Sequence, residues 1–124
     1  MTLKNFLSIN AILFVPFGLA MLIAPTYLFP MFGINLDFDG TLMARVFGSA
    51  LLSLGLICYL VKSESRSNNA LKAILVGNLL FHGIDTASTF VASSTGVMNS
   101  MGWMFTFLHF VLAVGFLYFL FKRA

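Results

Sequence analysis

Four ionisable side chains fall inside long apolar stretches of this sequence: Arg45, His82, Asp85 and His109. A charge in the hydrocarbon of a bilayer is costly, so such residues usually face the protein interior and pair with one another. If each stretch is a helix, Arg45 lies roughly 8 Å and Asp85 roughly 10–12 Å below the same membrane boundary. We therefore expect an Arg45–Asp85 ion pair in the outer half of the protein.

Further polar residues accompany the two histidines at helical spacing. In the third stretch, intervals of four, three and four residues place on one helical face the side chains of Asn78, His82, Asp85 and Thr89. The fourth stretch adds Thr106 and His109, three residues apart. Counting residues from the helix ends places both histidines near the bilayer midplane, at depths that differ by no more than roughly one helical turn. These residues are our candidate ligand-binding set, together with Arg45.

Two histidines at matched depth allow several kinds of site. They could hydrogen-bond across the helices and hold them together. They could form a proton relay with Asp85, or contribute to a pocket for an organic or anionic ligand. They could also ligate a haem from both sides, although that hypothesis rests on two residues and no motif. The sequence leaves these alternatives open, and the cofactor is unknown.

Other kinds of site have no support in the sequence. No third and fourth metal ligand lies at a suitable helical spacing, and Cys58 is the only cysteine. There is no glycine-rich phosphate loop, and no Ser/His/Asp or Cys/His pattern of recognisable spacing. We therefore assign no metal and no catalytic residue, and leave open whether the chain is an enzyme.

The elements that position these residues follow from composition. Of the 124 residues, 60% are hydrophobic and 9% are charged, whereas a soluble domain carries about 25% charged residues. Four apolar stretches approach or exceed the roughly 20 residues that a spanning helix needs. Lipid offers the backbone no hydrogen-bond partners, so each stretch must be helical. We predict an all-α, polytopic membrane protein, a single domain over 1–124 that forms an antiparallel four-transmembrane-helix bundle, with helices at about 5–24, 40–61, 69–92 and 99–121.

The connections between these stretches indicate their orientation. The first, 25–39, is too apolar for a free loop and should lie at the membrane surface, partly helical. The second ends in a helix cap at Ser67 or Asn68, and the third turns at Gly96. Neither the first nor the third contains a basic residue, whereas the termini and the second connection hold Lys4, Lys62, Arg66, Lys72, Lys122 and Arg123. This distribution predicts a multi-pass protein of the inner (plasma) membrane with cytoplasmic termini.

Two segments carry a resemblance to a known family. The second stretch reads ARVFGSALLSLGLICYL, and the end of the first reads LIAPTYLFPMFGI. An arginine, small residues and an L-x-x-G-L run in the second span, after a proline-ended first span, resemble the small bacterial DoxX-like four-helix membrane proteins and related families of unknown function. The likeness in topology covers most of the chain. It implies a compact four-helix bundle and assigns no catalytic residue.

These observations favour two functions of different kinds. In the first, the bundle interior binds an amphipathic small molecule, quinone-like or a lipid, near Arg45, His82, Asp85 and His109. In the second, the chain is a structural accessory subunit or scaffold of a larger membrane complex, or self-associates through small residues on helix faces. A bis-histidine haem carrier is a weaker alternative. The lipid bilayer is a partner in each case. Nucleic acid is not expected, because the basic residues flank apolar stretches and form no polar face.

Overall fold

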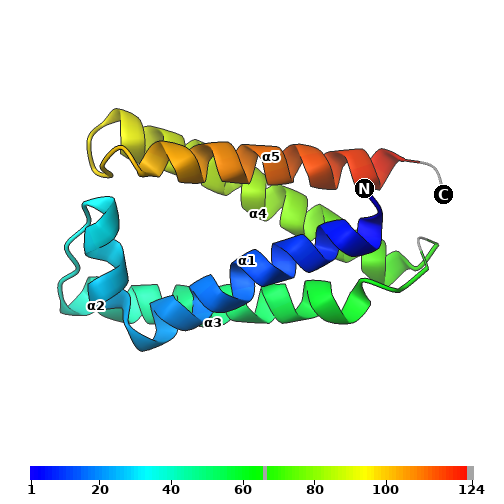
Figure 1. The fold of residues 1–124 in the computed structure, drawn as a ribbon, viewed down its shortest axis with the longest axis horizontal. Helices are drawn as coiled ribbons and strands as arrows, with labels where there is room; N and C mark the ends of the chain where they lie inside the picture. The colour runs from blue at the N-terminus through cyan, green and yellow to red at the C-terminus, as the bar shows by residue number, and fades with distance from the viewer. Residues whose placement is uncertain (66, 123–124) are drawn as a thin grey trace. The chain divides into compact units, whose positions relative to one another are not determined.

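A computed structural model describes residues 1–65 and 67–122, and within them the chain is helical, with no strand. Four helices are long and apolar enough to cross a membrane: α1 (Leu3–Ile23), α3 (Phe38–Val61), α4 (Asn69–Ser94) and α5 (Gly102–Phe121) (Figure 1). The short helix α2 (Pro25–Leu28) and the 3₁₀ helix η1 (Phe29–Phe32) lie between α1 and α3. The prediction of an all-α protein with four candidate spanning helices is confirmed.

Polar side chains fix where these helices begin. The Asp37 carboxylate accepts a hydrogen bond from the Gly40 amide at 2.7 Å, so α3 begins two residues earlier than expected. Asn68 caps α4 by accepting from the Ala70 amide at 2.8 Å, which confirms one of the two predicted caps. Helix α5 begins at Gly102, later than predicted, because Asn99 takes part in a turn and accepts from the Met101 amide.

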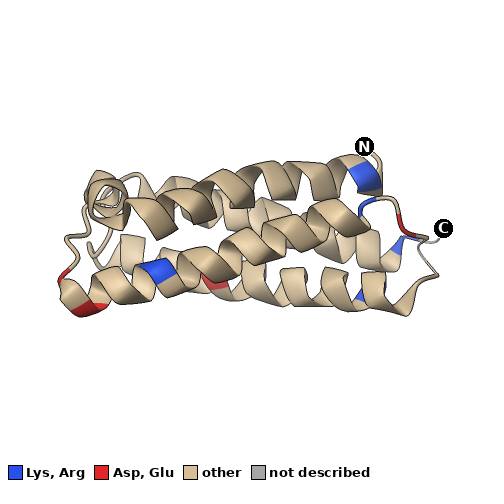
Figure 2. Ribbon diagram, turned by 90° about the horizontal axis from the view of Figure 1, so that it is seen from below, with Lys and Arg blue, Asp and Glu red and all other residues tan. Residues whose placement is uncertain are grey.

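The contacts divide the chain into two compact units, Met1–Lys62 and Ser63–Ala124, each built on one antiparallel helix pair. The single domain over 1–124 and the bundling of all four helices stay predictions. The predicted basic residues Arg66 and Arg123 lie outside the described residues. Figure 2 shows that the charged residues gather mainly toward the helix ends, with few along the helices.

Glycines allow the backbones of α1 and α3 to pack closely in the first unit. A Cβ atom at Gly18 would lie 2.6 Å from the Leu52 nitrogen, and one at Gly48 would lie 2.8 Å from the Gly18 carbonyl oxygen. Such distances are too short for a real Cβ, so the two backbones approach as closely as glycine permits. Further along the pair, the buried Asn10 amide donates to the Cys58 sulfur at 3.4 Å.

The first connection is partly helical, as predicted. Figure 1 shows α2 and η1 lying across the directions of α1 and α3. The Phe32 ring packs near Phe17 of α1, with centroids 6.2 Å apart, and η1 ends at Gly33 in the left-handed conformation that glycine adopts without strain. Its position at the membrane surface stays a prediction.

Helices α4 and α5 form the second pair, joined by a short turn. Gly96 has a φ of +77°, which confirms it as the turn residue. Only a minor part of each long helix is buried inside the protein. In the most apolar 18-residue segment of α1, α3, α4 and α5, the buried share is 39%, 28%, 17% and 22%. Exposure of such a large apolar surface to water is unfavourable, so a lipid environment fits these helices.

Candidate functional site: the polar network of α4 and α5

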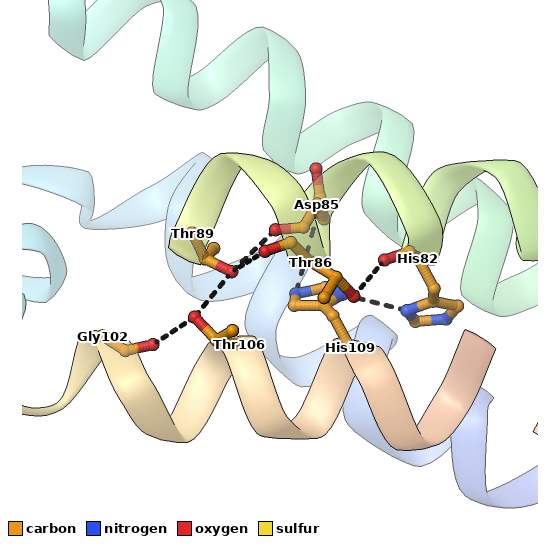
Figure 3. A network of polar contacts seen from close by, with 7 residues as sticks. All are labelled: His82, Asp85, Thr86, Thr89, Gly102, Thr106 and His109. Atoms are coloured by element: carbon orange, nitrogen blue, oxygen red, sulfur yellow. Dashed lines mark hydrogen bonds and ion pairs between the residues drawn. The ribbon is translucent and has the colours of Figure 1, made fainter. Parts of the chain in front are cut away.

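Seven residues of α4 and α5 form a continuous set of polar contacts, which we call the α4–α5 polar network: His82, Asp85, Thr86, Thr89, Gly102, Thr106 and His109 (Figure 3). As residue numbers rise along α4, the contacted positions fall along α5, as an antiparallel pair requires. The predicted polar faces of the two helices therefore face each other.

A direct hydrogen bond joins the two histidines. Their Nδ1 atoms lie 2.9 Å apart. Such a bond needs one Nδ1 that carries a hydrogen and one that offers a lone pair, so the rings must differ in protonation at this atom. The bond confirms that the two residues lie at matched height and hydrogen-bond between helices.

Asp85 lies near the other ring nitrogen of His109. The His109 Nε2 atom lies 3.8 Å from Asp85 Oδ2, an ion-pair distance that is long for a direct hydrogen bond. If Nε2 carries the hydrogen toward the carboxylate, Nδ1 of a neutral His109 is an acceptor, and His82 Nδ1 must donate to it. The three side chains then form a chain of contacts, with a hydrogen bond between the two rings and a longer ion-pair contact to the carboxylate.

Burial decreases along this chain. His82 has 0% of its surface exposed, and the side chains of His109 and Asp85 are 12% and 26% exposed. The His82 ring stacks on Phe116 with centroids 5.4 Å apart and meets the edge of Phe81 at 5.3 Å. Two aromatic neighbours thus hold the imidazole in the orientation that its bond to His109 needs.

Threonines tie the two helices together beside the histidines. Thr106 donates to the Thr89 hydroxyl at 3.0 Å and also lies 3.2 Å from the Gly102 carbonyl. Thr89 donates to the Asp85 carbonyl at 2.6 Å, and Thr86 donates to the His82 carbonyl at 2.7 Å. Each hydroxyl hydrogen is therefore used within the protein, whereas oxygen lone pairs remain able to accept.

A groove of about 360 Å³ lies against this network. It is lined by the two hydroxyl-bearing residues Thr86 and Thr106 and by the aromatic residues Phe90, Trp103, Phe107 and Phe110. Phe90 and Trp103 meet edge to face, with centroids 5.5 Å apart. An apolar groove with a few polar groups at one wall is typical of a small-molecule site, and its volume lies at the small end of their range.

The paired histidines do not fit a haem held between them. An ion bound to both rings would need its two nitrogens about 4 Å apart, judged from metal–nitrogen bonds of about 2.0–2.1 Å. The Nδ1 atoms are 2.9 Å apart, and the ring centroids only 5.1 Å, so no macrocycle can lie between the rings. Within residues 1–65 and 67–122, no three His, Cys, Asp or Glu side chains are grouped to hold a metal.

The predicted site residues divide into three groups. The structure brings together His82, Asp85, Thr89, Thr106 and His109. Asn78 is buried on α4, as its face predicts, and the bond of its side chain to the Ile74 carbonyl stays within its own helix. Arg45 lies on α3, in the other unit, so its pairing with Asp85 stays a prediction.

Sequence reasoning missed Thr86 and Ser93. Thr86 follows His82 by four residues, the spacing at which a threonine bonds back to a carbonyl, and this signal could have identified it. Ser93 gave no such signal. Among the described residues its buried hydroxyl oxygen has no hydrogen-bond partner, and a Cβ at Gly102 would collide with it.

Comparisons of the chain with protein-family models, with curated proteins and with solved structures found no match. The resemblance to DoxX-like membrane proteins therefore stays a prediction. The function has to be argued from the geometry of the α4–α5 pair.

Proposed function

We propose that this chain is a membrane-embedded binding protein for a small amphipathic molecule, and that the groove beside the α4–α5 polar network is its site. One observation carries the proposal: Thr86 and Thr106 both line the groove and both belong to the network that contains His82, His109 and Asp85. A ligand in the groove would meet an almost wholly apolar surface along its body, with the two threonine residues at one wall.

The hydrogen bonding of this wall favours a particular ligand chemistry. Both threonines already donate their hydrogens within the protein, so their oxygens are left to accept. The ligand should therefore present a hydroxyl donor, as the reduced form of a quinone or a hydroxyl-bearing lipid does. Its apolar ring or chain would pack on Phe107 and Phe110.

Trp103 provides the test, because it is the only tryptophan and lines the groove. A short-chain hydroquinone, titrated into the detergent-solubilised protein, should change its fluorescence in a saturable way. The dimethyl ether of the same molecule has no donor and should bind about five-fold more weakly for each hydrogen bond lost. Thr86→Val should weaken hydroquinone binding to a similar extent, and Thr95→Val, whose hydroxyl bonds to its own helix, should leave it unchanged. Unsaturable quenching, equal in all variants, would refute the proposal.

A structural role is the second candidate, and the glycines of α4 favour it. A Cβ at Gly77 or Gly83 would meet no atom of residues 1–65 and 67–122 within 4 Å, unlike one at Gly102. These two positions are therefore not used for close packing against α5, and they leave the backbone open to another helix. Cross-linking in native membranes tests this role: a specific adduct lost on Gly83→Leu supports it, and an exclusively monomeric protein counts against it.

A further inference from the structure

A second pocket, of about 260 Å³, lies at the end of the α4–α5 pair where α4 begins and α5 ends. Its polar part is formed by Lys72, Lys122 and Ser67, and its apolar part by Leu71, Leu75, Phe119 and Leu120. None of these residues belongs to the α4–α5 polar network. The pocket therefore needs an explanation of its own.

In the described part of the chain, the positive charges of this pocket are not paired directly with a carboxylate. Lys72 is the fourth residue of α4, where the helix dipole favours anions and disfavours a cation, and the first turn of α4 contains no acid. Neither Lys72 nor Lys122 forms an ion pair with a described carboxylate. Glu64 lies in the preceding connection, and its carboxylate accepts from the Asn68 side chain at 3.3 Å. An anionic ligand would balance both lysines.

The apolar wall identifies the kind of anion. Leu75 and Phe119 lie three residues further toward the middle of their helices than Lys72 and Lys122, about 4.5 Å deeper, whereas Leu71 is level with Lys72. The side chains of Leu71, Leu75 and Phe119 are largely buried, with 1%, 3% and 3% of their surface exposed. Since the pocket lies at the ends of two helices that are long and apolar enough to span a membrane, the lysines would lie at the level of lipid headgroups, and Leu75, Phe119 and Leu120 nearer the acyl chains. We propose that this pocket binds one anionic phospholipid, with its phosphate between Lys72 and Lys122 and an acyl chain along the leucines.

Native mass spectrometry of the full chain tests this proposal. Protein in a non-ionic detergent is titrated with phosphatidylglycerol or with phosphatidylcholine of the same acyl chains. We expect retention of one phosphatidylglycerol, and about five-fold weaker retention for each of Lys72→Gln and Lys122→Gln. Lys4→Gln and Lys62→Gln, in the other unit, are the matched controls and should retain the lipid unchanged. Size-exclusion profiles and helical circular dichroism establish that each variant is folded.

Three outcomes would overturn the proposal. Equal retention of the two lipids would show that the phosphate charge is not recognised. An equal loss with Lys62→Gln would show that net charge alone acts. Protection by glycerol phosphate or inorganic phosphate at the concentrations where the lipid binds would assign the pocket to a soluble phosphate, and the apolar wall would then have no role.

Discussion

The carboxylate of Asp85 lies 3.8 Å from the Nε2 atom of His109 and favours a hydrogen on that nitrogen. A neutral His109 that directs Nε2–H toward this carboxylate leaves only its Nδ1 lone pair for His82. We predict that His109 carries its hydrogen on Nε2 and His82 on Nδ1. Nitrogen-15 shifts of labelled histidine report the tautomers directly, and Asp85→Asn should redistribute them. The opposite assignment would mean that the carboxylate does not orient the pair.

The threonine contact between α4 and α5 should contribute modestly to stability. Thr106→Val removes the hydrogen bond to Thr89, and in membrane proteins such bonds are worth about 0.6 kcal/mol on average and about 1.7 at most. Thr95→Val removes only bonds to its own helix and should change stability by less than about 0.5 kcal/mol. Equilibrium unfolding in mixed micelles compares the two variants. A Thr106→Val loss no greater than that of Thr95→Val would assign the bond no net contribution.

The two helix pairs use glycine in different ways. In the α1–α3 pair, Gly18, Gly48 and Gly55 lie against backbone or Cβ atoms of the facing helix, at distances that exclude any side chain. In α4, Gly77 and Gly83 have open space around them. The first pair therefore depends on the absence of a Cβ, whereas the second is held by hydrogen bonds and aromatic packing.

This difference predicts opposite effects of the same substitution. Gly18→Ala should destabilise the protein by about 1–3 kcal/mol, because the added methyl must push α3 away. Gly77→Ala meets no atom and gains helix propensity, so it should be neutral or stabilising by less than about 1 kcal/mol. Thermal unfolding of the two variants in one detergent measures both. Equal effects would show that α1 and α3 do not approach as closely as the contact distances require.

The distribution of basic residues over the chain predicts the orientation of all four spans. In the described residues, the lysines lie at or near helix ends, on the side where the termini and the second connection belong. The native cysteine, Cys58, is fully buried, so it should not react with a membrane-impermeant maleimide. Asn99→Cys, in the third connection, should be labelled in intact cells, and Ser63→Cys only after permeabilisation. Labelling in the reverse order would invert the topology.

The type and approximate extent of the helices could be predicted from the sequence, because lipid imposes one solution on each apolar stretch, whereas the starts of α3 and α5 differ from the prediction by two and three residues. The spacing of His82, Asp85 and Thr89 likewise placed them on one face, because helical periodicity needs no knowledge of a partner. Spacing alone does not identify the partners of this face: within the α4–α5 pair the Asp85 carboxylate lies within ion-pair distance of His109, and the expected Arg45–Asp85 pair stays a prediction.

The sequence could not predict the distance between α4 and α5. The two histidines at matched depth allowed either a haem or a hydrogen bond, and the choice depended on how closely α4 approaches α5. That approach is set by side-chain volumes on both helices at once, including Phe116 against His82 and Ser93 against Gly102. Apolar runs and charges are properties of one segment read alone, whereas grooves and hydrogen-bonded pairs exist only where two segments are packed at a particular register.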